Sequence, residues 1–147
     1  MRNVVVVALG EERYAVELRW VREIFTLGPV TSIPTAPREV AGAVSFRGAI
    51  LPLLHGCRLA APGRDPARTP LPGDTALLLD VDDTRVALAV DRVDEVATLE
   101  PAPGGEGALV GRGGEAIPVL NARAVVRAAS VLVAEAGADP RPPDVPR

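Results

Sequence analysis

The chain has 147 residues, 48% of them hydrophobic but only 3% aromatic, with a formal net charge of −3. This length suits one domain or two very small lobes that share a core, and the acidic balance excludes a broad basic surface for nucleic acid. The single cysteine, Cys57, excludes an internal disulfide and a cysteine-based metal cluster. Branched aliphatic residues dominate the apolar set, which favours strands over helices.

The predicted elements are mostly short strands separated by turns. Alternation and short apolar runs predict strands at residues 4–9, 14–18, 50–54, 75–81, 85–90, 108–110 and 117–120. The spacing of Trp20, Val21 and Ile24 favours a single helical turn, and residues 40–44 predict another. Pro, Arg and Gly make residues 62–74 a surface loop. Asn121 is placed to cap a helix that runs to about residue 134.

Two copies of one phrase lie 72 residues apart. Val21-x-Glu23-Ile24-x-Thr26-Leu27-x-Pro29 reappears as Val93-x-Glu95-Val96-x-Thr98-Leu99-x-Pro101. A second block, residues 48–54, matches residues 114–120 at an offset of 66. Each copy should therefore fold as the same unit, and the two should pack about a pseudo-twofold axis with a groove at their junction. The sequence predicts a duplicated pair of small barrels.

These copies define the expected domain organisation. We expect a single domain over residues 1–135, in which residues 12–70 and 75–120 carry the repeat and the terminal segments complete the barrels. Residues 136–147 are rich in proline and are expected to be a disordered tail. The apolar run from Val4 to Val7 is too short for a signal peptide or a membrane span, which predicts a cytoplasmic protein without membrane insertion.

Separated blocks of the sequence resemble a known family. They are Tyr14-x-Val16-x-Leu18-x-x-Val21-x-Glu23-Ile24, Ile33-Pro34-x-Ala36-Pro37-x-x-Val40-x-Gly42-x-Val44-x-x-Arg47-Gly48-x-Ile50-Leu51-Pro52, and Val90-Asp91-x-Val93-x-Glu95-Val96. In this order they resemble the CheW-like domain over roughly residues 4–128. The resemblance implies an all-β fold of two pseudosymmetric five-stranded SH3-like barrels, with short helical turns and a C-terminal helix.

The resemblance also implies a function. Stand-alone CheW-like proteins are non-enzymatic scaffolds of bacterial chemosensory systems, without cofactor or metal, that link the cytoplasmic tips of chemoreceptors to the regulatory domain of a CheA-type histidine kinase. Other CheW-like domains are further partners. Val21, Glu23, Arg47 and Val96 match family positions that bind or couple to the receptor. Alternative roles are core packing for the two valines, and a bond to loop carbonyls for Arg47.

Departures from the family pattern concern the kinase half of this function. Ser45-Phe46 stands where Asn-Leu is usual, His55 where Asp is usual, and Ala87 where Gly is common. Residues 100–115 are shorter than usual and rich in Gly, Pro and Ala. We therefore expect a divergent, shortened member that binds receptors and tunes or links the arrays, with kinase coupling weak or lost. An ordinary adaptor that binds both partners is the alternative.

Other classes of function have weaker support in the sequence. His55 and Cys57 lack a third, orienting catalytic group, so we read them as a surface histidine and a small buried cysteine. Asp80-x-Asp82-Asp83 could form a weak cation site, and Gly111-x-Gly113-Gly114 lacks the Lys and the helix of a phosphate loop. A nucleic-acid-binding or small-ligand-binding SH3-like barrel remains the alternative of another class, although aromatic residues for base stacking are few.

Overall fold

The computed structural model describes residues 1–34, 36–60, 69–105 and 107–135. The predicted tail, residues 136–147, and most of the predicted loop at 62–74 lie outside this description. The elements, in chain order, are β1 (Arg2–Leu9), β2 (Glu12–Glu17), the 3-10 helix η1 (Leu18–Trp20), β3 (Val21–Thr26), β4 (Val30–Thr31), β5 (Val40–Phe46), β6 (Ala49–His55), α1 (Gly56–Ala60), β7 (Thr75–Val81), β8 (Thr84–Val90), β9 (Arg92–Leu99), β10 (Ala108–Val110), β11 (Ala116–Pro118) and α2 (Ala122–Glu135).

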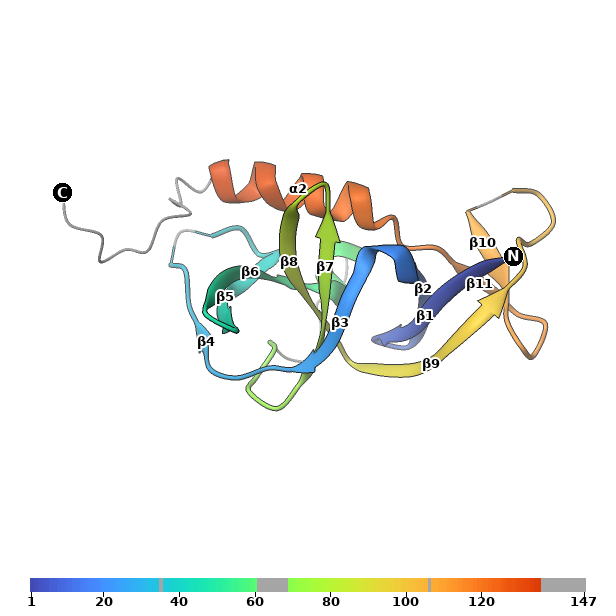
Figure 1. Cartoon of the computed structure of the whole chain (residues 1–147), viewed down its shortest axis with the longest axis horizontal. Helices are drawn as coiled ribbons and strands as arrows, with labels where there is room; N and C mark the ends of the chain where they lie inside the picture. Colours follow the sequence, from blue (N-terminus) through green and yellow to red (C-terminus); the bar gives the residue numbers. More distant parts are fainter. Residues whose placement is uncertain (35, 61–68, 106, 136–147) are drawn as a thin grey trace.

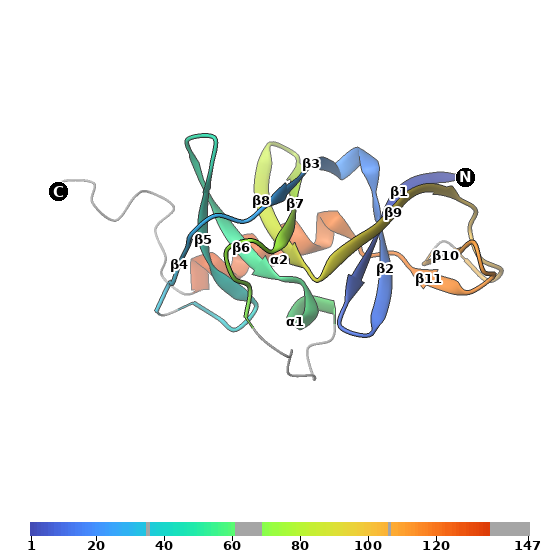
Figure 2. The same cartoon turned by 90° about the horizontal axis from the view of Figure 1, so that it is seen from below.

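The strands form two lobes that lie side by side (Figures 1 and 2). Lobe A is one sheet with the order β3-β7-β8-β6-β5-β4. Lobe B combines the sheet β2-β1-β9 with the hairpin β10-β11. Bridges from Ala15 to Val119 and from Pro101 to Leu109 connect the two parts of lobe B. The predicted fold class, an all-β chain of two related barrels with a C-terminal helix, is confirmed.

Strand register shows that the two lobes are equivalent. In lobe A, β3 pairs with β7 so that Val21 lies opposite Leu79; in lobe B, β9 pairs with β1 so that Val93 lies opposite Val7. Both partners in each pair differ by 72 residues, the offset of the sequence repeat. Both strand pairs also contain a register shift at the same place, next to Val21 in one and next to Val93 in the other. The repeated phrase thus encodes a repeated strand with a repeated bulge.

The two copies exchange their hairpins. Hairpin β1-β2 precedes β3 in the chain but pairs with β9 in lobe B, whereas hairpin β7-β8 pairs with β3 in lobe A. Each lobe is therefore built from a hairpin of one copy and the later strands of the other. Neither copy forms its lobe from its own residues alone, so the lobes depend on each other for folding.

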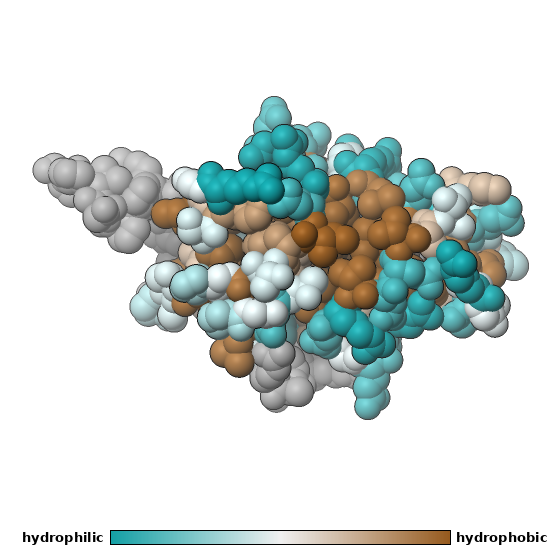
Figure 3. Space-filling view, turned by 60° about the horizontal axis from the view of Figure 1, so that its bottom comes forward, coloured by the Kyte–Doolittle hydropathy of each residue, from teal (hydrophilic) through white to brown (hydrophobic). Residues whose placement is uncertain are grey.

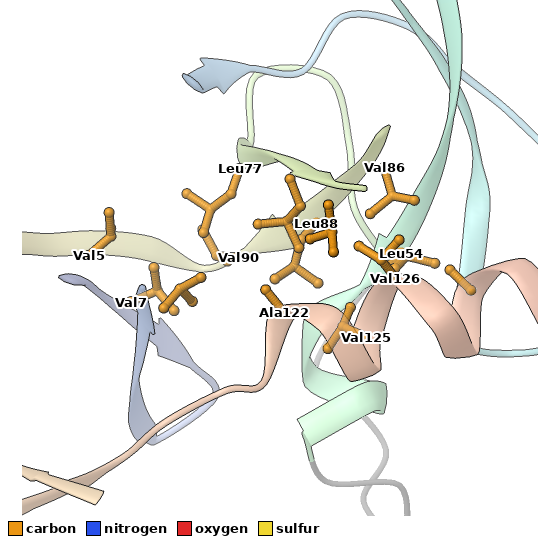
Figure 4. Close-up of a cluster of buried hydrophobic side chains, with 14 of the residues drawn as sticks. Val5, Val7, Leu54, Leu77, Val86, Leu88, Val90, Ala122, Val125 and Val126 are labelled. Atoms are coloured by element: carbon orange, nitrogen blue, oxygen red, sulfur yellow. The ribbon is translucent and has the colours of Figure 1, made fainter. Parts of the chain in front are cut away.

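A shared central core lies between the lobes and beneath α2. Figure 4 shows its side chains from β1, β6, β7, β8 and α2 pointing toward one another. The labelled members are Val5, Val7, Leu54, Leu77, Val86, Leu88, Val90, Ala122, Val125 and Val126. Each lobe also has its own smaller core, centred on Leu53 and Leu78 in lobe A and on Val4 and Val6 in lobe B. Full burial of such a side chain stabilises by about 1.5–3 kcal/mol, so the central core holds the two lobes together.

The C-terminal helix begins as predicted. The side-chain oxygen of Asn121 accepts the backbone N–H of Ala124 at 3.0 Å, which satisfies one of the donors left free at a helix start. Val125, Val126 and Ala129 then form the buried stripe of α2 against the central core. Among the described residues, no helix combines the length and apolar character that a membrane crossing requires.

Both helical turns predicted in the first half were wrong. Residues 21–24 belong to β3, preceded only by the short η1, and residues 40–44 belong to β5. In each case the ladder hydrogen bonds to a neighbouring strand decide the conformation over the local spacing of apolar residues. Gly42 shows why β5 must pass here: a Cβ on this residue would collide with the carbonyl oxygen of Thr31 on β4.

Candidate functional site

The first two predicted site residues stand on either side of the bulge in β3. Val21 pairs with Leu79, whereas Glu23 pairs with Leu78, so the bulge absorbs Arg22. Val21 is half-buried and packs against the central core. Glu23 lies on the side of the lobe A core, to which Leu78 belongs, with its side chain 33% exposed. Val21 thus has the packing role considered as its alternative, while Glu23 presents a carboxylate at the surface.

Arg47 lies at the tip of the β5-β6 hairpin. Phe46 pairs with Ala49, so Arg47 and Gly48 form a two-residue turn, and both have positive φ, at 48° and 84°. Such turns favour Asn, Asp or Gly at both positions, and a residue with a Cβ costs about 1–2 kcal/mol in the left-handed conformation. The arginine is therefore held in place by what its side chain does, since its backbone preference opposes the turn.

The structure brings Arg47 and Glu23 together. Nη2 of Arg47 lies 3.1 Å from Oε1 of Glu23, and the guanidinium also lies 4.9 Å from the centre of the Phe46 ring. Phe46 in turn packs against Phe25 of β3, with ring centroids 4.6 Å apart. The Arg47 side chain is still 74% exposed. It is anchored at one edge but remains accessible to a partner.

Val96 lies on β9 in lobe B, across the pseudo-twofold axis from β3. It is 55% exposed and pairs with Val5 of the central core. Its equivalent in lobe A, at the 72-residue offset, is Ile24, which is 40% exposed and pairs with Leu77 of the same core. Ile24 was not among the predicted site residues. The repeat itself was the signal that could have identified it.

The exposed apolar side chains contribute to one surface. Figure 3 shows hydrophobic side chains gathered in the middle of one face, over the region of β3 and β9, with hydrophilic side chains at its margins. Ile24 and Val96 are two of the few large apolar residues that the described part of the chain leaves exposed. Contiguous apolar surface rimmed by polar residues is typical of a protein-binding site.

The other sequence candidates lie away from this surface. His55, predicted to be on the surface, is buried at the end of β6, only 5% exposed. It lines a cavity of about 20 Å³ together with Cys57, Asp74 and Asp91. The thiol of Cys57 donates to Oδ2 of Asp91 at 3.7 Å, and the same oxygen accepts the N–H of Gly10 at 2.5 Å. This chain of bonds ties α1 to the turns after β1 and β8, a structural role.

Cys57 is expected to react slowly with alkylating agents. Burial, followed by the negative charge and hydrogen bond of Asp91, raises the pKa of its thiol above the ordinary value. The thiolate is the reactive form, so less of it is present at pH 8 than for free cysteine. Asp91→Asn removes the charge, lowers this pKa and should accelerate iodoacetamide labelling of the folded protein at pH 8. Equal labelling rates for the two proteins would contradict this assignment.

The acidic and glycine-rich candidates have structural partners. Oδ2 of Asp80 lies 3.3 Å from Arg22 and 3.2 Å from Arg85, so its charge is compensated within lobe A. Asp82 and Asp83, with φ of 50° and 65°, form the turn of the β7-β8 hairpin. Within the described ranges, no three His, Cys, Asp or Glu side chains are grouped to hold a metal ion. The surface over β3 and β9 is therefore the candidate site.

Comparisons with known sequences agree with this architecture. The model of the CheW-like domain matches residues 3–130. The chain is 31% identical to the probable chemotaxis protein CheW of Rhizobium etli and 29% identical to the chemotaxis protein CheW of Rhizobium meliloti. Each match spans 108 residues, or 69% of this chain and 67% of the relative. The chemotaxis protein CheW of Treponema pallidum is 32% identical over 60% of this chain and 52% of its own length.

A solved structure has the same fold. The scaffolding protein TtCheW from Thermoanaerobacter tengcongensis superposes with a TM-score of 0.66, at 22% identity, over 82% of this chain and 88% of that protein. At this identity the superposition establishes the fold, and the family follows from the sequence match over most of the chain. The protein belongs to the CheW-like domain family.

Proposed function

We propose that this protein is a non-enzymatic scaffold of a bacterial chemosensory system that binds the cytoplasmic tip of chemoreceptors. It acts in the cytoplasm, where it links or tunes arrays of receptors and CheA-type histidine kinase. The family to which the chain belongs comprises chemotaxis scaffolds and adaptors. The observation that carries the proposal is the exposed apolar surface over β3 and β9, bordered by the Glu23–Arg47 ion pair.

The chemistry of this surface fits a helical partner. A receptor tip is a helical hairpin, and an amphipathic helix binds by placing its apolar face on an exposed apolar surface. Ile24 and Val96 offer such contacts, one from each lobe. Arg47 and Glu23 offer a cation and an anion at the border, which can exchange their mutual bond for bonds to charged residues of the helix. Arginine is a frequent anchor at interfaces because its planar guanidinium both stacks and forms paired hydrogen bonds.

We propose that coupling to the kinase is weak or absent. The hairpin of lobe B is reduced: β10 and β11 have three residues each, whereas β5 and β6 in lobe A have seven. The turns around it are rich in glycine, so they offer few side chains to a partner. A specific interface usually buries about 1,200–2,000 Å². Loss of strand and loop surface on this scale reduces what lobe B can contribute to the regulatory domain of a kinase.

Calorimetric titrations with each partner separately test this function. The receptor signalling domain is expected to bind the wild-type protein with a micromolar Kd, and the kinase regulatory domain is expected to show at least about tenfold weaker binding or none. Arg47→Glu should weaken receptor binding about tenfold. It should change the free energy of unfolding by less than about 1 kcal/mol, because the pair it breaks is largely exposed.

Two outcomes would change the proposal. Micromolar kinase binding would restore the ordinary adaptor, which links both partners with similar strength. A wild-type protein that binds neither receptor nor kinase would remove the scaffold function itself. A receptor affinity that Arg47→Glu leaves unaltered would exclude Arg47 from the site.

A further inference from the structure

Lobe B carries its own copy of the charged pair that borders the site. Nε of Arg112 lies 2.6 Å from Oε1 of Glu95. Glu95 is the counterpart of Glu23 at the 72-residue offset, and the two occupy matching positions in β9 and β3, just after the bulge. Arg112 lies in the turn of the β10-β11 hairpin, as Arg47 lies in the turn of β5-β6. The turn of lobe B is longer, yet its arginine reaches back to the equivalent glutamate.

The two pairs are also alike in exposure. The side chains of Arg112 and Arg47 are 72% and 74% exposed, and those of Glu95 and Glu23 are 27% and 33% exposed. In both lobes the arginine is at the surface and its carboxylate partner is partly sheltered. The apolar equivalents Ile24 and Val96 each lie next in the chain after these glutamates. The surface therefore presents the order glutamate, exposed apolar residue, hairpin arginine twice, once on each lobe.

The surroundings of the second pair differ in two respects. Arg47 lies over the ring of Phe46, whereas Gly111 precedes Arg112 and offers no ring. Glu95 has a second cation, Nη2 of Arg13 at 3.6 Å. Because Arg13 continues to compensate Glu95, Arg112 can leave this carboxylate at a smaller cost than Arg47 can leave Glu23. The pair in lobe B is well placed to exchange partners.

We propose that Glu95 and Arg112 form a second charged half-site, so that the helical receptor tip is contacted by an arginine–glutamate pair on each lobe. This inference rests on the proposed function and extends it to residues outside the predicted set. Its occupant is the receptor tip that covers Ile24 and Val96, since the second pair is continuous with that surface through Val96. The tip must then present acidic side chains on both sides of its apolar stripe, one toward each hairpin arginine.

Receptor-binding titrations of charge variants test the half-site. Arg112→Glu in the full chain should weaken binding of the receptor signalling domain at least about fivefold, and Arg112→Gln should weaken it less. Combined with Arg47→Glu, the losses should multiply, because the two arginines lie in separate ion pairs. The loss caused by Arg112→Glu should shrink as ionic strength rises, as expected for exposed charges.

Arg13→Gln is the matched control. Arg13 belongs to the same group of ion pairs, with contacts to Asp94, Glu95 and Glu115, but its side chain is only 33% exposed. This variant disturbs the ion pairs without removing the exposed arginine, so receptor affinity should stay within about twofold of wild type. An equal loss for Arg13→Gln and Arg112→Glu would overturn the half-site in favour of a structural effect.

The remaining outcomes separate this inference from the proposed function. If Arg47→Glu weakens binding and Arg112→Glu leaves it within twofold of wild type, the receptor engages one charged pair only and the half-site is refuted, while the scaffold function stands. If the wild-type protein does not bind the receptor domain, the proposed function fails and the half-site fails with it. Circular dichroism of each variant confirms that loss of binding is not loss of fold.

Discussion

Aspartate in place of Ile24 or Val96 should weaken receptor binding by about 2–4 kcal/mol, the range of a well-packed interface anchor. Each substitution removes apolar contact area and places an unpaired charge where the partner excludes water. Both side chains are substantially exposed in the free protein, at 40% and 55%, so the fold itself does not require them. The measurement is calorimetric titration with the receptor signalling domain, accompanied by thermal melting of each variant.

Leu71→Asp is the matched control for these two variants. Leu71 is 51% exposed, as they are, but it lies in the loop before β7, outside both β3 and β9. Its substitution should leave receptor affinity within about twofold of wild type. If all three variants lose affinity equally, the effect reports added negative charge on the whole protein. If Ile24→Asp alone loses affinity, lobe A carries the site without lobe B.

Most strands of this fold could be predicted from the sequence because they are half-buried and alternate. Val86 to Val90 and Thr75 to Val81 follow simple patterns, and their hairpin turn at Asp82 and Asp83 carries residues that tolerate positive φ. The internal duplication could also be predicted, since the repeated phrase shares polar residues as well as apolar ones. Its register is visible only in the structure, where Val21 and Val93 face Leu79 and Val7.

The errors in the sequence interpretation have a common physical cause. The interval from Trp20 to Ile24 has helical spacing because a bulge at Arg22 shifts the alternation of β3 by one residue. A bulge is stabilised by pairing with a strand more than fifty residues away, which a local pattern does not contain. The exchange of hairpins between the two copies is hidden for the same reason. Contacts with distant strands decide which lobe each hairpin joins.

The candidate site could be predicted only in part. Glu23 and Arg47 were identified through the family resemblance, and the structure places them in one ion pair across 24 residues of sequence. Ile24 was missed because a helical turn would have given it a different neighbourhood from that of Val96. His55 was assigned to the surface because a lone histidine after an edge-like strand has no periodic signal for burial. In the structure, β8 pairs alongside β6 and covers it.

Leu88→Ala should lower the stability of the whole protein by about 2–5 kcal/mol, the usual cost of removing a fully buried leucine. Leu88 is 0% exposed and lies on β8 between Leu77 of β7 and Leu54 of β6. All three belong to the central core that joins the lobes. For a chain of this size, each kcal/mol lowers Tm by about 2–4 °C, so a fall of roughly 5–15 °C is expected in thermal melting.

The shape of that transition matters as much as its midpoint. Because the lobes share the central core and exchange hairpins, both should unfold together, and Leu88→Ala should shift one transition without splitting it. Leu71→Ala, at an exposed position, should change stability by no more than about 0.5 kcal/mol. Separate transitions for the two lobes would contradict the interdependence argued from the strand pairing. A single transition means that the two sides of the receptor surface, on β3 and β9, are held in register by the same buried side chains and are lost together.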